Sequence, residues 1–428
     1  MTDVKEILPV SQVDAVVTLP GSKSFSHRAL IAAGLAEGTS TLRHLLDSED
    51  TRYTAQALRD LGCQIDWGSQ TCQVTGTGGN LAVPANPLYL GDSGTSMRFL
   101  TAVAALGQGR YVLTGSQRLC QRPIQDLLDA LVGLGVEASS EHHNGCPPVV
   151  VQARGLAGGP TQVAGGISSQ FLSALLLIAP FAARDVEITV LGELVSKPYV
   201  DITLSVMEDF GIAYYRRGYA FFAVPAGQRY QAQDYEIEGD ASSASYFLGA
   251  AAITGGRVRL TNLNPASCQG DVGFLQVLAQ MGCQVATTAE GVSLQGGPLR
   301  GIEINMAAMP DLVPTLAVVA AFAQGQTVIT GVPHLRHKES DRLQAVATEL
   351  AKMGVTVEEK RDGLIITGGR PHGALIQTYN DHRMAMSFAL AGLQVPGVRI
   401  ADPGCVAKSF PEFWEYFDKL VDEGQPPH

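Results

Sequence analysis

The stretch DRLQAVATELAKMGVTV, residues 341–357, contains the pattern that decides the fold. Its apolar residues recur at helical spacing up to Met353, and Gly354 then separates them from residues that alternate like a strand. The same pattern of helix, glycine and strand recurs along the chain, with glycine at positions 62, 135, 211, 282 and 354. Because these glycines stand 71 to 76 residues apart in a chain of 428, the sequence predicts about six copies of one repeat.

Each repeat is predicted to be a βαβα-like unit. A polar loop opens an Ala- and Leu-rich helix, a strand follows, and a second loop leads to an amphipathic helix that ends at the glycine, as is usual at a helix C-terminus. The strands that follow the first helices are TSTLRHL (39–45), RYVLTGS (110–116), VEITVLG (186–192), RVRLTNL (257–263), QTVITGV (326–332) and GVRIADP (397–403). Six repeats divide most simply into three plus three, which indicates an α/β protein of two domains.

Polar residues typical of helix N-caps precede the first helix of every repeat. These loops are LPGSKSFSHRAL (19–30), LGDSGTSMRFL (90–100), GGISSQFLSAL (165–175), GDASSASYFLGA (239–250), MPDLVPTLAV (309–318) and YNDHRMAMSFAL (379–390). A helix N-terminus offers free N–H groups and a partial positive charge. Each loop is therefore a candidate anion site, although plain capping is the simpler explanation of any single one.

Composition excludes several classes of protein. With 46% hydrophobic and 17% charged residues the chain is a packed globular protein, and its net charge of −11 argues against a nucleic-acid binder. The longest apolar stretch is too short for a membrane span, and the N-terminus has no targeting pattern. The seven cysteines have no disulfide or metal spacing, so we expect reduced thiols, no metal site and a cytoplasmic location.

Cations gather in the loops of this acidic chain. They are Lys23, Arg28, Arg98, Arg122, Lys197, Arg336, Lys338, Arg342, Arg383 and Lys408. Ten cations in equivalent loop positions favour a concave site for multiply charged anions, although each alone is typical of a solvated surface. Three carboxylates, Asp311, Glu339 and Asp381, stand beside them. Asp311 and Glu339 fit either an acid and base pair or a structural ion-pair network, and spacing leaves both interpretations open.

Nine segments together resemble the bacterial monofunctional form of the 5-enolpyruvylshikimate-3-phosphate synthase family. They are LPGSKSFSHRAL, LGDSGTSMRFL, QRPIQDLLDAL, GGISSQFLSALL, GELVSKPYVDITL, EGDASSASYFL, HKESDRL, YNDHRMAMSFAL and CVAKSFPEF, and they run from residue 19 to 413. The resemblance implies a two-domain inside-out α/β barrel with three repeats in each domain. It implies an N-terminal domain of residues 22–239, a C-terminal domain of residues 1–21 and 240–428, and an active site in the cleft between them.

The resemblance also implies a reaction and the residues that perform it. The family condenses shikimate 3-phosphate with phosphoenolpyruvate and releases phosphate, as a monomer and without a metal or organic cofactor. Asp311 would act as the base, and Glu339 together with Lys23 would handle the proton of the methylene group. The substrate-binding residues implied are Lys23, Ser24, Arg28, Gly94, Thr95, Arg122, Ser168, Ser169, Gln170, Ser196, Tyr199, Asp311, His334, Lys338, Arg342, Arg383 and Lys408.

Some positions depart from the family pattern. Asp92 and Phe99 stand where the family has Asn and Pro, and His27 and His334 each replace an Asn. They imply a changed substrate affinity and a changed sensitivity to glyphosate, the family's inhibitor, rather than a different reaction.

Two other functions remain as alternatives. One is the sister enolpyruvyl transferase that acts on UDP-N-acetylglucosamine and carries a reactive cysteine in the loop before the Arg-Pro pair, where this chain has Cys120. The other is an anion-binding homologue without catalytic activity. The SKS segment at Lys23 and the KES-D-R residues from Lys338 to Arg342 favour the shikimate enzyme over the first, and a retained pair of carboxylates argues against the second.

Overall fold

The computed structural model describes residues 3–69, 71–288 and 291–423. Contacts divide the chain into two compact units, which we call the N-terminal unit, Gly21–Ile237, and the C-terminal unit, Met1–Pro20 with Glu238–His428. The chain passes between them after Pro20 and after Ile237, where the sequence led us to expect the boundaries after residues 21 and 239.

Among the described residues each unit contains three small sheets, and all six sheets follow one plan. The first two strands of a sheet are parallel, and every further neighbour is antiparallel. A parallel pair requires a crossover, and the first helix of the repeat supplies it in four of the six sheets. In the other two, β14 with β3 and β2 with β15, most of the N-terminal unit lies between the paired strands in the sequence. The six repeats predicted from the glycine spacing are therefore confirmed.

The N-terminal unit holds three four-stranded sheets. In spatial order they are β14 (Asp234–Glu236), β3 (Thr39–Arg43), β5 (Thr71–Thr75), β4 (Gln64–Trp67); β6 (Leu88–Tyr89), β7 (Gln108–Thr114), β9 (Val149–Arg154), β8 (Glu137–Ser140); and β10 (Gly159–Ala164), β11 (Val186–Leu191), β13 (Phe221–Val224), β12 (Tyr215–Arg217). Burial alternates along strands such as β11, so each sheet buries one face and exposes the other.

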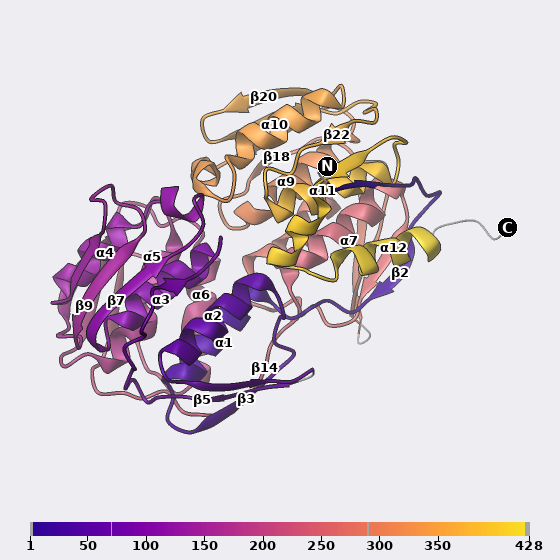
Figure 1. Ribbon diagram of the computed structural model, residues 1–428. Helices are drawn as coiled ribbons and strands as arrows, with labels where there is room; N and C mark the ends of the chain where they lie inside the picture. Colours follow the sequence, from indigo (N-terminus) through magenta and orange to yellow (C-terminus); the bar gives the residue numbers. More distant parts are fainter. Residues whose placement is uncertain (1–2, 70, 289–290, 424–428) are drawn as a thin grey trace. The chain divides into compact units, whose positions relative to one another are not determined.

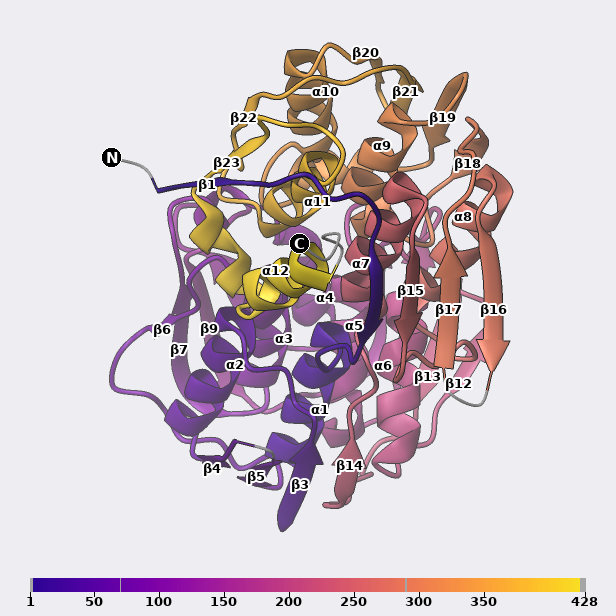
Figure 2. The ribbon, with the colours of Figure 1, turned by 90° about the vertical axis from the view of Figure 1, so that its right-hand side faces the viewer.

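The C-terminal unit repeats this arrangement with one sheet of three strands. Its sheets are β2 (Asp14–Val17), β15 (Arg257–Leu260), β17 (Gly291–Gln295), β16 (Gln284–Thr288); β18 (Glu303–Asn305), β19 (Gln326–Thr330), β21 (Gly363–Thr367), β20 (Thr356–Lys360); and β22 (Leu375–Ile376), β23 (Arg399–Ala401), β1 (Val4–Glu6). Figure 2 shows β2, the indigo strand, beside β15, and β1 pairs with β23, so these two early strands complete sheets of this unit.

The first helix of each repeat lies inside its unit, and the sheets lie outside. These helices are α1 (Lys23–Leu35), α3 (Gly94–Ala104), α5 (Ser169–Ile178), α7 (Ala241–Thr254), α9 (Val313–Ala321) and α11 (His382–Gly392). They are apolar and buried on nearly all sides; α7, α9 and α11 pack against one another in the C-terminal unit (Figure 1). Helices inside and sheets outside form the predicted inside-out α/β arrangement.

The second helices are amphipathic and end as predicted. They are α2 (Glu49–Asp60), α4 (Gln125–Gly133), α6 (Pro198–Asp209), α8 (Phe274–Met281), α10 (Arg342–Lys352) and α12 (Phe413–Glu423). The glycines at 62, 135, 211, 282 and 354, which follow the first five, all have positive φ. Glycine adopts this left-handed conformation without a steric penalty, so the recurring residue marks a helix end.

The prediction of an N-cap before every first helix is wrong at two positions. Ser93, Ser168, Asp240 and Asp381 cap α3, α5, α7 and α11 with their side chains. Ser22 makes no side-chain cap to α1, and α9 follows a 3₁₀ turn, η4 (Pro310–Leu312), without one. Pro314 in the first turn of α9 lacks an N–H, so fewer donors there require a cap.

None of the helices in the described part of the chain combines the length and apolar character that crossing a membrane requires.

Candidate functional site

The C-terminal unit contains a cluster of buried charges centred on Arg342, the first residue of α10. Its guanidinium donates to Asp311 Oδ1 at 2.9 Å, to Glu339 Oε2 at 2.9 Å and to Asp381 Oδ2 at 2.8 Å. The Arg342 side chain is only 2% exposed and that of Asp381 is fully buried. Burial disfavours the charge on Arg342, but Asp381, Glu339 and Asp311 outweigh it and raise the pKa. Arg342 therefore stays protonated.

Asp311 lies among three cations. Besides Arg342, it accepts a hydrogen bond from Arg383 Nη2 at 2.9 Å, and Lys338 Nζ lies 3.4 Å from its Oδ1. Burial alone would raise the pKa of Asp311, but the positive charges of Arg383, Lys338 and Arg342 hold it well below the usual value. Asp311 is therefore an ionised carboxylate whose neighbours are also the cations predicted to bind anions.

The side chains of the charged cluster come from the loops before α9, α10 and α11 and from the first turns of these helices. Asp311 lies in η4 before α9, and Arg383 lies in the first turn of α11, whose N-cap Asp381 accepts the Arg383 N–H. A 3₁₀ turn, η5 (Pro333–His337), precedes Lys338. The first turns of α9, α10 and α11 therefore supply one cluster, because these helices pack together.

His334 and Lys408 are also buried in this unit. His334 lies in η5, where burial, and then the nearby Lys338, lower its pKa to about 4. It is therefore a neutral imidazole at physiological pH. Lys408 ends a further 3₁₀ turn, η6 (Pro403–Lys408), at the same place in its repeat that η5 and Lys338 have in theirs.

Asp271 is a buried carboxyl that sequence reasoning missed. It lies in η3 (Gly270–Gly273), in the loop where other repeats carry a cation, and its side chain accepts a hydrogen bond from the Ser242 hydroxyl. Its Oδ1 has no hydrogen-bond partner among the described residues. Burial, followed by the charge of Asp311, raises its pKa to about 7.

We expect Asp271→Asn to stabilise the protein progressively as pH rises from about 4 to 7. The unfolded chain releases this proton near pH 4, whereas the folded protein keeps it up to about pH 7. Folding therefore costs free energy that grows across this window and stays level above it. Three pKa units correspond to at most about 4 kcal/mol. Urea unfolding of the variant and the wild type at several pH values measures the difference.

The matched control is Glu303→Gln, because Glu303 is an exposed carboxyl of the same unit. Because a surface substitution changes the free energy of unfolding little, this variant should stay within about 0.5 kcal/mol of the wild type. An Asp271→Asn variant that gains no stability between pH 4 and 7 would show that Asp271 is ionised in the folded protein.

The N-terminal unit has its own polar group at the start of α1. Lys23 Nζ lies 3.2 Å from Oδ2 of Asp50, a buried residue in the first turn of α2. Arg28, one turn after Ser24, donates to the Ser24 carbonyl oxygen at 2.8 Å and to the Thr203 hydroxyl at 2.7 Å. Asp50 was missed because nothing in its sequence context distinguishes it from an ordinary first-turn carboxylate.

A second polar group joins α3 to α5. Arg98 Nη1 donates to Gln170 Oε1 at 2.9 Å, and Gln170 Nε2 donates to the Thr95 hydroxyl at 2.9 Å. Gly94 begins α3 and has no room for a side chain, since a Cβ there would lie 2.6 Å from Arg98 Nη1 and 2.7 Å from the Arg122 guanidinium. Gly94, Thr95, Arg122 and Gln170 are therefore neighbours, as a shared binding role requires.

The remaining predicted residues of this unit lie at helix starts. Ser168 is the N-cap of α5 and Ser169 its first residue. Ser196 precedes α6 with a φ of +54°, and the Tyr199 carbonyl oxygen, in the first turn of α6, accepts from Arg28 Nη2 at 2.9 Å. Arg28 thus connects the polar group at the start of α1 to α6.

Two of the ten loop cations are engaged away from these groups. Arg336 pairs with Glu359 at 2.6 Å and with Asp341 at 3.1 Å, and Lys197 pairs with the exposed Glu193. For these two cations the interpretation as solvated surface residues holds.

The departures from the family pattern occupy defined places. Asp92 accepts a hydrogen bond from the Ser116 hydroxyl. Phe99 is buried in α3, and the Arg28 guanidinium carbon lies 5.0 Å from the centre of its ring, a cation–π contact. Bulk at position 99 therefore lies against Arg28. His27 Nδ1 lies 2.8 Å from the Thr54 hydroxyl.

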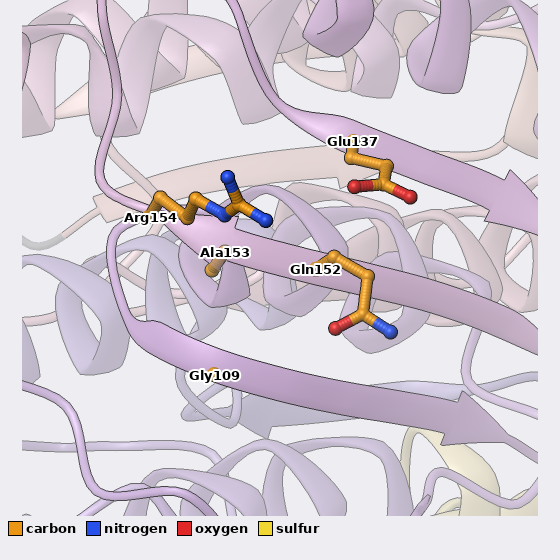
Figure 3. A pocket seen from close by; sticks show the side chains of 5 residues that line it. All are labelled: Gly109, Glu137, Gln152, Ala153 and Arg154. Carbon is orange, nitrogen blue, oxygen red and sulfur yellow. The ribbon is translucent and has the colours of Figure 1, made fainter.

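A hollow of about 460 Å³ lies elsewhere in the N-terminal unit. Figure 3 shows its lining residues on β7, β8 and β9: Gly109, Glu137, Gln152, Ala153 and Arg154. None of them is a predicted site residue, and the hollow lies on a sheet rather than at the helix starts. We therefore assign the candidate site to the charged groups above.

Comparisons with known proteins show the family of this chain. A family model described as EPSP synthase (3-phosphoshikimate 1-carboxyvinyltransferase) matches residues 7–417. Proteins named 3-phosphoshikimate 1-carboxyvinyltransferase from Photobacterium profundum and Shewanella piezotolerans are 47% and 46% identical, over 98% and 97% of this chain and 98% of each relative. A solved structure of EPSP synthase from Acinetobacter baumannii is similar to this chain with a TM-score of 0.82 at 31% identity, and the match covers 98% of both chains.

The family model spans residues 7–417, and the Shewanella piezotolerans relative aligns with 97% of this chain. The chain therefore belongs to the EPSP synthase (3-phosphoshikimate 1-carboxyvinyltransferase) family of transferases.

Proposed function

We propose that this protein transfers the enolpyruvyl group of phosphoenolpyruvate to the 5-hydroxyl of shikimate 3-phosphate, in the shikimate pathway that leads to chorismate and the aromatic amino acids. The observation that carries the proposal is the buried Arg342, which holds two carboxylates, Asp311 and Glu339, at 2.9 Å each. A site that only binds anions gains nothing from two carboxylates there, whereas a proton-transfer site needs them.

The cations bind the anionic groups of the substrates. Phosphoenolpyruvate is bound by Lys23, Gly94, Arg122, Gln170, Arg342, Arg383 and Lys408. Shikimate 3-phosphate is bound by Lys23, Ser24, Arg28, Ser168, Ser169, Gln170, Ser196, Tyr199 and Lys338. The neighbouring positions of Gly94, Arg122 and Gln170 support the first set, and the position of Arg28 at Ser24 and Tyr199 supports the second.

Asp311 serves as the base, although its low pKa makes it a weak proton acceptor in the free protein. Arg383, Lys338 and Arg342 cause that low pKa, and they are also the residues that meet the incoming phosphate and carboxylate groups. Once substrate anions pair with these cations, Asp311 loses part of their field and its proton affinity rises. The substrates therefore activate the base themselves.

The reaction then proceeds by addition and elimination. Asp311 accepts the proton of the 5-hydroxyl while the oxygen of that hydroxyl attacks C2 of phosphoenolpyruvate. Glu339, assisted by Lys23, gives a proton to the methylene carbon. The C–O bond to phosphate in the tetrahedral intermediate then breaks, and the phosphate leaves with the proton that Asp311 had accepted. Glu339 takes back a proton from the new methyl carbon, which restores the double bond. The cations stabilise the charge on the departing phosphate.

A phosphate-release assay tests the proposal. The purified protein should release phosphate only when shikimate 3-phosphate and phosphoenolpyruvate are both present, and mass spectrometry should find the coupled product. Release with UDP-N-acetylglucosamine instead would favour the sister transferase, in which Cys120 would matter. Binding without turnover would favour the non-catalytic homologue.

We further propose that the protein works as a monomer in the cytoplasm and that residues of both units bind the same substrates. Six cysteines of the described residues, Cys63, Cys72, Cys120, Cys146, Cys283 and Cys405, carry free thiols, which supports a reducing location. Light scattering at micromolar concentration tests the monomer: a mass well above 45.2 kDa would contradict it.

Gly94→Ala should raise the KM for phosphoenolpyruvate by roughly ten- to a hundredfold, since displacing binding groups by about 1 Å has effects of this size. The new methyl group would lie under 3 Å from the guanidinium groups of Arg98 and Arg122. These are the ends of flexible side chains, so the fold survives while the cations move. Steady-state kinetics measures the change.

Gly369→Ala is the control, because a Cβ at Gly369 would meet nothing within 4 Å. An unchanged KM for phosphoenolpyruvate in Gly94→Ala would mean that Arg122 does not bind this substrate.

A further inference from the structure

The loop between β22 and α11 has an unusual backbone. Tyr379 and Asn380, two consecutive residues other than glycine, both adopt the left-handed region, with φ of +56° and +54°. Side chains disfavour this conformation, and it persists where surrounding contacts impose it, often at functional sites. Asp381 and Arg383 of the charged cluster follow directly.

Glu349 of α10 supplies those contacts. Its carboxylate is completely buried and accepts hydrogen bonds from the Gln377 N–H at 3.1 Å and from the Tyr379 hydroxyl at 2.5 Å. Lys352 Nζ lies 2.8 Å from both of its oxygens. The charge of Glu349 is thus paired with Lys352. The same carboxylate also accepts hydrogen bonds from the start of the loop and so fixes its position.

The end of the same loop is held by the same helix. Asp381 accepts from Arg342 and from the Ser340 hydroxyl at 2.9 Å, and it also accepts the Arg383 N–H. Arg342 and Glu349 are seven residues apart on α10, about two helical turns, so they lie on one face. This face of α10 therefore forms hydrogen bonds with both ends of the loop.

We propose that Glu349 is a positioning residue for phosphoenolpyruvate, which fixes Arg383 and Asp381 by holding the strained loop from Gln377 to Asn380. The proposal rests on the function proposed above, in which Arg383 binds phosphoenolpyruvate. An arginine fork binds carboxylate or phosphate in a defined orientation, so a shift of its backbone weakens binding without removing its charge.

Glutamine cannot replace Glu349 without loss. The carboxylate accepts from three donors, whereas glutamine has one acceptor oxygen and turns its NH₂ group towards a buried donor. The buried donor that faces this NH₂ group loses its hydrogen bond, and no water is there to replace it. Tyr379→Phe is a milder change, since it removes one hydrogen bond from a half-exposed ring.

Steady-state kinetics with each substrate varied in turn tests the proposal on Glu349→Gln, Tyr379→Phe and the double variant. We expect the KM for phosphoenolpyruvate to rise about tenfold in Glu349→Gln and severalfold in Tyr379→Phe. The double variant should resemble Glu349→Gln, because both changes break the same contact. The KM for shikimate 3-phosphate should stay within about twofold, a split that general destabilisation does not produce.

Glu358→Gln is the matched control, because Glu358 is an exposed carboxylate on β20 that also pairs with a lysine, Lys360. It should leave both KM values unchanged. An unchanged KM for phosphoenolpyruvate in Tyr379→Phe, or an equal rise for both substrates, would overturn the proposal. Should Glu349→Gln fail to fold, Tyr379→Phe alone decides.

Wild-type turnover separates this inference from the proposed function. If the wild type releases no phosphate, the proposed transfer is wrong, and calorimetry of phosphoenolpyruvate binding in the presence of shikimate 3-phosphate then tests Glu349 alone. Weaker binding to Tyr379→Phe than to the wild type would support the positioning role, and equal or undetectable binding to both would overturn it.

Discussion

Replacing Asp311 by asparagine is expected to lower kcat by about 10² to 10⁴ while affinity for shikimate 3-phosphate stays within about tenfold, the range typical of a lost general base. Asparagine keeps the shape of the side chain but cannot accept the proton. Arg342 retains Glu339 and Asp381 as partners, so the cluster keeps its other ion pairs. Phosphate release at saturating concentrations of both substrates measures kcat.

The control for Asp311→Asn is Asp362→Asn, at an exposed position in the loop between β20 and β21 of the same repeat. It should turn over normally. Near-normal turnover by Asp311→Asn would exclude Asp311 as the base and leave it the purely structural ion-pair role that the sequence also allowed.

Replacing Arg342 by methionine is expected to destabilise the protein by about 3–5 kcal/mol and to abolish measurable transfer. The substitution leaves Asp381 completely buried without its principal cation, and breaking a buried ion pair from one side has an effect of this size. It also removes a cation that binds phosphoenolpyruvate. Urea unfolding and phosphate release measure the two effects.

Arg336→Met and Arg342→Lys complete this experiment. Arg336 also pairs with two carboxylates, Asp341 and Glu359, but these pairs are partly exposed, so its loss should cost about 1 kcal/mol or less. Lysine at 342 keeps the charge, but its ammonium group lacks the planar fork with which arginine binds three carboxylates at once. Compared with Arg342→Met, Arg342→Lys should therefore recover more of the stability than of the activity. Equal destabilisation by Arg336→Met and Arg342→Met would contradict a buried network at Arg342.

The sequence alone predicted the repeats because the signals for them are local. A glycine at a helix end and the change from helical to alternating periodicity depend on a few neighbouring residues, so positions 62 to 354 mark five helix ends correctly. The N-cap prediction failed at Ser22 and before α9 because capping depends on where one side chain points. At α9 a proline and a 3₁₀ turn change which donors need a partner.

The resemblance named the candidate site residues, but it did not include Asp50, Asp271 and Glu349. Each is a carboxylate in an ordinary polar sequence, and only packing buries it beside Lys23, Ser242 or Tyr379. In the same way, Lys197 and Arg336 resemble the other loop cations in sequence and differ only in their partners.

The sequence by itself determined the number of repeats, the order of their elements and which loops carry charge, because periodicity and turn residues act over short distances. Tertiary structure decided which charges meet. Asp311 is ionised and Asp271 holds its proton to about pH 7 because one is surrounded by Arg342, Arg383 and Lys338 and the other is buried without such close cations. Burial and through-space charge arise from helices packed together across about a hundred residues, and spacing along the chain does not report them.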